Sequence, residues 1–133
     1  MDGKLWNIGM KVEDVDAEAR FLAAAGGRLL LREKVESAAG TVDYALIQFG
    51  DTRIFMTPKT IFEDSLSEPL HLGLTHAVFE VADLGPEVER LTALGTEVLL
   101  PPTEITAKFG RRRIAFFRSP GGLVFELMQI LSE

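Results

Sequence analysis

The sequence predicts an α+β fold built from two tandem βαβββ modules, and internal repetition is the main reason. The run LWNIGMKVEDV at 5–15 aligns with LTHAVFEVADL at 74–84 at an offset of 69 residues, and 50–56 aligns with 121–127 at an offset of 71. Each half also shows the same order of strand, helix and turn signals. Few residues are identical between the two halves, so the inference of duplication depends on the apolar pattern and on the positions of the turn residues. Chance similarity between two α/β segments is the alternative.

The first module is expected over 5–58. It opens on an alternating run, 8–12, in which every second residue is apolar, and this is typical of a strand packed on one face. Asp14 follows as a helix N-cap, and Gly26 ends the helix pattern. Three further strands are expected, at 28–37, 42–49 and 52–58.

The second module is expected over 72–131 and repeats this order. Asp83 is the expected helix N-cap and Gly95 the expected helix stop. The three strands that follow are expected at 96–101, 112–119 and 122–131. Residues 59–71 form a polar linker that is too short to separate independent domains, so 1–133 is expected to form a single domain.

Composition excludes several classes of function. The chain has 133 residues, no cysteine and a formal charge of −6, so disulfides and thiolate chemistry are excluded and nucleic acid is a disfavoured partner. No signal-peptide pattern opens the sequence, and no apolar run is long enough for a membrane helix. We therefore expect a cytoplasmic protein that binds neither nucleic acid nor membranes.

His76 and Glu126 are the strongest candidate site residues. His76 lies on the first strand of the second module, on the face opposite Ala77 and Phe79, which are expected to pack under the helix. Glu126 is an acid in an apolar final strand, where an unpaired carboxylate would cost several kcal/mol. The first and last strands of a module are plausible neighbours, so both side chains are expected to face one hollow. Taken singly, each residue is more often structural; together, an imidazole and a carboxylate suit a divalent first-row metal.

The sequence resembles the vicinal oxygen chelate superfamily, which contains glyoxalase I, methylmalonyl-CoA epimerase, extradiol dioxygenases and bleomycin- or fosfomycin-resistance proteins. The stretch FGRRRIAFFRSPGGLVFELMQ at 109–129 is similar to the family's closing stretch, and LTHAVFEVADL is similar to its opening strand. The turn Ser119-Pro120-Gly121-Gly122 lacks both acids of the family's Asp-Pro-Asp-Gly turn. The resemblance covers nearly the whole chain and is specific for the fold rather than for the reaction.

This resemblance implies a cup-shaped mixed sheet with helices on the outside, formed by paired modules and often present as a homodimer. The modules pair either within one chain or by exchange between two chains. It also implies that His76 and Glu126 bind a divalent ion such as Ni, Zn, Mn or Fe, with Glu126 as the candidate catalytic group.

The first module departs from the ligand pattern that the family implies. Its corresponding positions hold Asn7, a weak neutral ligand, and Phe55, which cannot bind a metal. The ligand set is therefore incomplete unless another side chain contributes, and the possible substitutes are His71, Gln48 and Glu80.

Other residues are candidates for binding a small molecule. Arg111, Arg112 and Arg113 could hold an anionic group, with a solvated turn as the alternative, and the resemblance favours Arg113. Lys11 shares the strand face of Asn7, so Lys11 is expected to reach the hollow. Asn7, Lys11, Phe55 and Arg113 are thus the predicted substrate-binding residues.

Two functional hypotheses follow. The first is a metal-dependent lyase, isomerase or dioxygenase that acts on a substrate with adjacent oxygens. The second is a metal-free protein of the bleomycin-resistance type, which sequesters a small molecule in its cleft. The retained pair of His76 and Glu126 favours the first hypothesis, whereas Asn7 and Phe55 favour the second. A domain that has lost any ligand is the third possibility.

Overall fold

A computed structural model describes residues 3–37 and 40–133 of the chain. The first half contains five elements: β1 (Lys4–Lys11), α1 (Val15–Ala24), β2 (Arg28–Ser37), β3 (Gly40–Phe49) and β4 (Thr52–Thr57). The second half contains five more: β5 (Gly73–Glu80), α2 (Leu84–Ala93), β6 (Glu97–Ala107), β7 (Gly110–Arg118) and β8 (Val124–Ser132). A short 3₁₀ helix, η1 (Glu63–Ser65), lies between the two halves.

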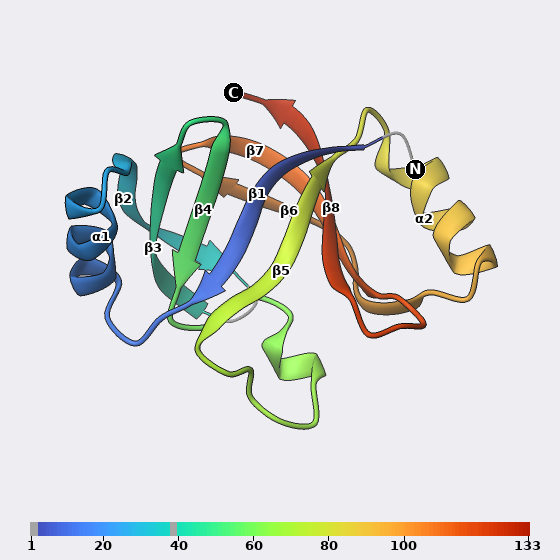
Figure 1. Ribbon diagram of the computed structural model, residues 1–133. Coiled ribbons are helices and arrows are strands. Elements are labelled where there is room, and N and C mark those ends of the chain that lie inside the picture. Colours follow the sequence, from blue (N-terminus) through green and yellow to red (C-terminus); the bar gives the residue numbers. More distant parts are fainter. Residues whose placement is uncertain (1–2, 38–39) are drawn as a thin grey trace.

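The eight strands form one sheet in the order β2-β3-β4-β1-β5-β8-β7-β6. The two modules join within one chain, where β1 pairs antiparallel with β5. The sheet curls into a cup, with α1 and α2 on its outer sides (Figure 1). Its two edge strands, β2 and β6, come into contact, so the cup is nearly closed on that side. The predicted fold of two βαβββ modules in a cup-shaped mixed sheet is therefore confirmed.

Strand register shows that the two halves are the same unit. Within the first module, β1 pairs parallel with β4 and places Ile8 opposite Ile54; within the second, β5 pairs parallel with β8 and places Ala77 opposite Phe125. These two pairs are related by the offsets of 69 and 71 that the sequence alignment uses. Even the bulge between Leu29 and Leu31 in β2 recurs between Val98 and Leu100 in β6. Repeated register and repeated irregularity favour duplication over chance.

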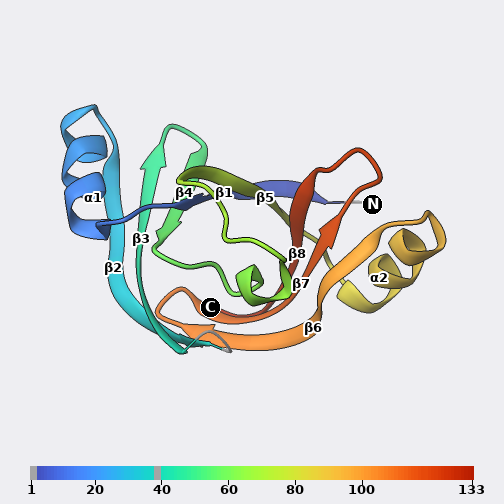
Figure 2. The same cartoon turned by 90° about the horizontal axis from the view of Figure 1, so that it is seen from below.

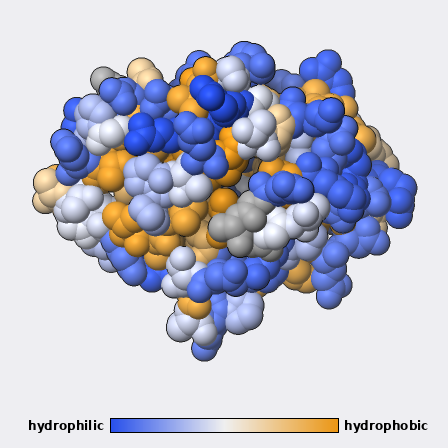
Figure 3. Space-filling view, turned by 180° about the vertical axis from the view of Figure 1, so that it is seen from behind, coloured by the Kyte–Doolittle hydropathy of each residue, from blue (hydrophilic) through white to orange (hydrophobic). Residues whose placement is uncertain are grey.

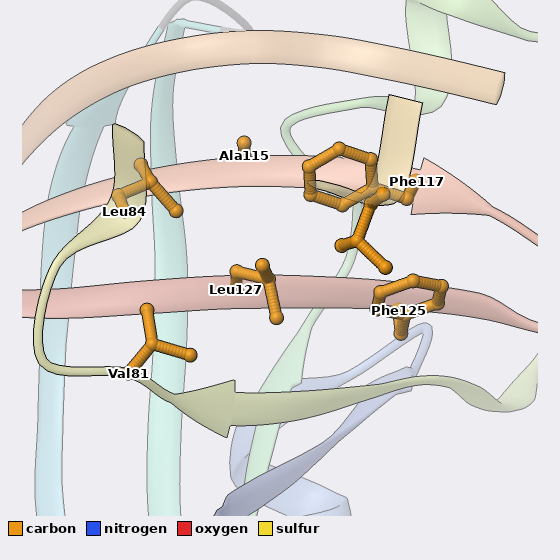
Figure 4. Packing of buried hydrophobic residues seen from close by; sticks show 7 residues of the cluster. Val81, Leu84, Ala115, Phe117, Phe125 and Leu127 are labelled. Atoms are coloured by element: carbon orange, nitrogen blue, oxygen red, sulfur yellow. The ribbon is translucent and has the colours of Figure 1, made fainter. Parts of the chain in front are cut away.

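Apolar side chains pack in three clusters, two outside the cup and one inside. Outside, α1 covers a cluster around Ala45, Ile47 and Met56, while α2 covers Phe117, Leu127 and their neighbours. Figure 4 shows this second cluster, in which side chains from β7 and β8 meet residues at and before the start of α2. The third cluster lies on the inner face of the sheet and includes Phe62, Val78, Leu99, Ile114, Phe116 and Met128.

The predicted elements differ from the observed ones in three places. Strand β6 continues to Ala107, beyond the expected end at 101; it contains Pro101 and Pro102, and as an edge strand it tolerates missing amide donors. Asp83 precedes α2 but its side chain makes no capping hydrogen bond, whereas Asp14 Oδ1 accepts one from the Ala17 amide at 3.0 Å.

The third difference concerns the linker. Residues 59–71 lie below the strands in Figure 1 and in front of the centre of the cup in the view from below (Figure 2), so the linker covers this end of the cup. Phe62 is fully buried there. Among the described residues, no helix is long and apolar enough to cross a membrane.

Candidate functional site

A cavity of about 90 Å³ lies inside the cup, between the curled sheet and the linker. Its wall is mainly apolar, with rings from Trp6, Phe55, Phe109 and Phe116. Its polar lining residues are Asn7, Thr57, Lys59, Thr60, His76 and Glu126. Both modules and the linker therefore contribute to one small site with a few polar groups, which is the usual composition of a ligand pocket.

His76 and Glu126 meet in this cavity as the sequence predicts. The parallel pairing of β5 with β8 places their strands side by side, and His76 Nε2 lies 3.4 Å from Glu126 Oε1. The two side chains are only 7% and 11% exposed. On the other side of the ring, Thr75 Oγ1 lies 2.8 Å from His76 Nδ1. A hydroxyl that donates to Nδ1 leaves the ring hydrogen on Nε2, directed at the Glu126 carboxylate.

The position of the His76 ring depends on a glycine in the neighbouring strand. Gly9 pairs with His76, and a Cβ atom built on Gly9 would lie 2.1 Å from Cε1 of the imidazole. No real side chain tolerates that distance, so the ring occupies the space that Gly9 leaves open. Phe62 and Phe116 meet the ring edge-on, at centroid distances of 5.5 and 5.1 Å. The imidazole is therefore held by β1, the linker and β7 together.

The first module supplies no matching pair of polar groups. Asn7 is buried and lines the cavity. Phe55 also lines it, stacked on Tyr44 at a centroid distance of 5.0 Å and edge-on to Phe109 at 5.9 Å. These aromatic contacts make Phe55 part of the apolar wall.

The donor set does not fit the metal site that the family resemblance implies. Within residues 3–37 and 40–133, no group of three or more His, Cys, Asp or Glu side chains is placed to hold a metal ion. The possible substitutes lie elsewhere: Gln48 bonds Arg28 and the Gly50 carbonyl, Glu80 faces Lys4, and His71 is exposed in the linker. His76 and Glu126 remain as a pair.

Lys11 and Arg113 do not line the cavity. Lys11 Nζ donates to Glu63 Oε2 at 2.6 Å and to the Leu70 carbonyl at 3.0 Å, so its charge holds the linker. Arg113 is exposed and alternates with the inward residues Ile114 and Phe116, which places it on the outer face of β7.

Arg112 is the inward arginine of β7, whereas Arg113 was the predicted substrate-binding residue. Arg112 is 1% exposed, and its guanidinium donates to the carbonyls of Ser132 and Phe109 at 2.9 and 2.6 Å. The guanidinium carbon lies 5.3 Å from the Phe109 ring centre and 5.8 Å from that of Trp6. Arg112 thus supports two rings of the cavity wall from behind.

The linker was missed as part of the site. Lys59, Thr60 and Ile61 line the cavity. Glu63 is buried and accepts hydrogen bonds from Lys11, from the Thr60 amide at 3.2 Å and from the Leu70 amide at 3.3 Å. Burial raises the pKa of Glu63, but these hydrogen bonds outweigh it and leave the pKa below its usual value. The apolar run of Ile61 and Phe62 was the available sequence signal.

No protein-family model matches the sequence, and no curated protein matches it either. Solved structures do match over the whole chain. A hypothetical protein, BH1468 from Bacillus halodurans C-125, is 18% identical with a TM-score of 0.71, covering 100% of this chain and 98% of that one. The Streptomyces coelicolor methylmalonyl-CoA epimerase, in complex with 2-nitronate-propionyl-CoA, is 20% identical with a TM-score of 0.70, covering 97% and 98%.

A larger enzyme matches as well. A mutant of 4-hydroxymandelate synthase from Streptomyces coelicolor is 18% identical with a TM-score of 0.68, and the match covers 98% of this chain and 48% of that one. At these identities the likeness concerns the fold. The epimerase and the synthase are both members of the vicinal oxygen chelate superfamily. The curled sheet, the duplicated modules and these matches together show that the chain has the vicinal oxygen chelate fold.

Proposed function

We propose that this chain binds a small, largely apolar molecule inside the cup and that Glu126, supported by His76, transfers a proton on that molecule. The contact of 3.4 Å between a buried imidazole and a buried carboxylate, in an otherwise apolar cavity, is the observation that carries this proposal. Structural and catalytic acid–base pairs both occur in proteins, but a structural pair has no need of a cavity beside it.

The chemistry is that of an isomerase or lyase acting next to a carbonyl group. The Glu126 carboxylate takes a proton from the carbon beside the carbonyl and returns it, while the negative charge moves to the carbonyl oxygen. The Asn7 side chain, which lines the same cavity, can donate an amide hydrogen to that oxygen. The name of the similar S. coelicolor protein, an epimerase, agrees with a reaction of this type.

Solvent exchange tests the proposal without knowledge of the natural substrate. Cyclohexanone and phenylacetone would be incubated with the protein in D2O, and loss of the proton signals beside the carbonyl would be followed by NMR. The exchange rate with the wild type should exceed the rate in buffer. In Glu126→Gln the rate above buffer should fall about 100-fold, since a general base contributes a factor on the order of 10²–10⁴. His76→Asn should lose less. Equal rates for wild type and Glu126→Gln would contradict the proposal.

A metal-dependent reaction remains the alternative within the same site. His76 and Glu126 would then be ligands, and water or substrate oxygens would have to supply the others. The same exchange assay separates the two cases: a metal-independent reaction keeps its rate after treatment with EDTA. Abolition by EDTA and recovery with Ni²⁺, Zn²⁺, Mn²⁺ or Fe²⁺ would favour the metal enzyme.

The second candidate function is metal-free sequestration of a small molecule. Phe55, at the position equivalent to Glu126, favours it because it makes the first-module side of the cavity apolar. A protein that binds the ketones but shows no exchange above buffer would support sequestration over catalysis.

We also propose that the chain forms a homodimer in the cytoplasm. Seen from behind, hydrophilic residues dominate the side on which α1 lies, and hydrophobic residues gather nearer the middle (Figure 3). The exposed large apolar side chains include Leu5, Leu72 and Leu74. Sedimentation at micromolar concentration would test the dimer, and a single species of 14.6 kDa would contradict it.

A further inference from the structure

We propose that the Phe109 ring, on the turn between β6 and β7, limits the size of the molecule that the cavity accepts. This inference deepens the function proposed above and rests on it. In this role Phe109 is a specificity residue, because it excludes larger ligands and takes no part in the transfer of the proton.

The cavity extends from the central strands to the seam where the two edges of the sheet meet. His76 and Glu126 line it from β5 and β8, in the middle of the strand order. Val35 and Ile105 line it from the edge strands β2 and β6, which contact each other. Figure 2 shows β6 and β7 running across to this side of the cup. A ligand with its reacting carbon at Glu126 can therefore extend toward the seam.

Phe109 closes the cavity at this seam by packing against the first module. Its ring lies edge-on to Phe55 and Tyr44, at centroid distances of 5.9 and 5.7 Å, and its centre is 6.5 Å from that of Trp6. Because Trp6 and Phe55 line the cavity together with Phe109, it is the ring that forms this part of the wall. Phe109 is only half-buried, so a smaller side chain here would open the rim of the cavity.

Arg112 holds the turn that carries Phe109. This buried guanidinium donates to the Phe109 carbonyl at 2.6 Å and to the Ser132 carbonyl at 2.9 Å. Lys108 and Phe109 form a two-residue turn, and Gly110 follows with a φ of +115°. A Cβ atom on Gly110 would collide with the Ser132 carbonyl and with the Arg112 guanidinium. This tight packing holds the turn, and with it the Phe109 ring, against the first module.

The lining of the seam sets the chemical class of ligand. The side chains that line the cavity there, from Val35, Val42, Ile105 and Phe109, are all apolar. A polar or charged group would lose its hydration at this wall without gaining a partner. The cavity of about 90 Å³ also admits only a compact molecule. The expected ligand is therefore a carbonyl compound whose apolar part is no larger than a small ring or a short branched chain.

A pair of ketones that differ only in length tests this inference. In 4-tert-butylcyclohexanone, an apolar group is added to cyclohexanone on the ring carbon opposite the carbonyl. Binding of each ketone would be measured by NMR titration for the wild type, Phe109→Ala and Phe109→Leu. Phe79→Ala is the matched control, because Phe79 is also half-buried but packs on the outer cluster under α2.

We expect the ratio of the Kd for 4-tert-butylcyclohexanone to the Kd for cyclohexanone to fall about tenfold in Phe109→Ala, since one extra carbon in an apolar pocket changes binding on the order of 10–200-fold. Phe109→Leu should lower the ratio less, and Phe79→Ala should keep the wild-type ratio. If the ketones bind and the ratio in Phe109→Ala is unchanged, the role of Phe109 is wrong while the proposed cavity function stands. If neither ketone binds the wild type or Phe109→Ala, both are wrong.

A double substitution tests whether Arg112 is a positioning residue that acts through Phe109. Arg112→Lys keeps the positive charge but cannot hold two carbonyls in the same fork, so the ratio should fall a few-fold. In the Phe109→Ala background the same substitution should leave the ratio unchanged, because the ring that it positions is gone. Equal falls in the two backgrounds would show that Arg112 does not act through Phe109.

Discussion

The two modules share one backbone and differ in what they direct into the cup. Helix α1 and helix α2 have the same length and start 69 residues apart, and the parallel strand pairs have equivalent register. At the inward positions, however, the second module carries His76 and Glu126 where the first carries Asn7 and Phe55. The apolar pattern and the glycine stops therefore determine the repeated backbone, while the inward polar positions vary without disturbing it.

The difference extends to the ends of the inner strands. Lys11, at the end of β1, holds the linker through Glu63, whereas its equivalent in β5, Glu80, has only a distant ion pair with Lys4 at 3.9 Å. One module thus holds the linker over the cavity, and the other supplies the contact between His76 and Glu126.

Breaking the linker contact should give the largest loss of stability. Lys11→Met leaves Glu63 as a buried carboxylate without its partner, and we expect a loss of about 3 kcal/mol in the free energy of unfolding. Urea denaturation would measure it. Lys4→Met removes the cation of the weaker ion pair, between Lys4 and Glu80. It should lower the free energy of unfolding by less than about 0.5 kcal/mol because Lys4 is mostly exposed. Similar losses for the two variants would contradict the assigned difference between the strand ends.

The same contact predicts a pH dependence. The pKa of Glu63 is lower in the folded chain than in the unfolded chain, so its contribution is present above the usual pKa of about 4.3 and is lost as pH falls below it. Glu63→Gln should therefore lose less stability than the wild type between about pH 5 and pH 3. Parallel pH profiles of Tm for the two proteins would contradict this assignment.

Gly9 should be the most sensitive glycine of the two inner strands. Gly9→Ala puts a methyl group where the His76 ring lies, and we expect a loss of about 2 kcal/mol or a displaced ring. A changed imidazole NMR signal would report displacement. Gly85→Ala is the control, since a Cβ there has no neighbour closer than 3.9 Å and alanine favours the helix. An unchanged His76 signal together with unchanged stability would show that the close approach is not required.

A substitution in the first module should create the missing metal ligand. Asn7→His adds an imidazole to the cavity that already holds His76 and Glu126, which brings the ligand set to three. Zn²⁺ or Ni²⁺ at a concentration well above Kd should then add about 2 kcal/mol to the free energy of unfolding of this variant. This stabilisation would be seen as a rise in Tm. The wild type should show a smaller rise. Equal rises in both proteins would mean that the pair already binds the ion without help from position 7.

The helix caps should show the smallest difference between modules. Asp14→Ala removes a side-chain cap and should cost about 1 kcal/mol, whereas Asp83→Ala removes no capping hydrogen bond and should cost less than about 0.5 kcal/mol. Chemical denaturation of the two variants would measure both values. Equal losses in the free energy of unfolding would show that the negative charge near the helix start, rather than the capping hydrogen bond, stabilises the helix.

Much of the fold could be predicted because repetition and alternation are local signals. The alternation in β5 correctly separated His76 from Phe79, and the shared strand order brought His76 and Glu126 together. The same alternation in β7 would have identified Arg112 as the inward arginine, but the family resemblance favoured Arg113.

The remaining features depend on contacts between distant segments. The linker has no period, and the apolar pair of Ile61 and Phe62 is too short a signal to show that Phe62 lies inside the cup. Lys11 does share a strand face with Asn7, but Glu63 and Leu70 approach from the linker and bind its amine. The sequence does not single out Gly9, because its importance comes from the His76 ring on the neighbouring strand.

We propose that the equivalent positions 55 and 126 serve different purposes, an apolar wall in the first module and a general base in the second. Solvent deuterium exchange into cyclohexanone, compared between Glu126→Gln and Phe55→Leu, tests it most directly. We predict a loss of about 100-fold for Glu126→Gln and a change of only a few-fold for Phe55→Leu, which alters the apolar wall alone. Equal effects of the two substitutions, or no exchange by the wild type above buffer, would contradict the claim.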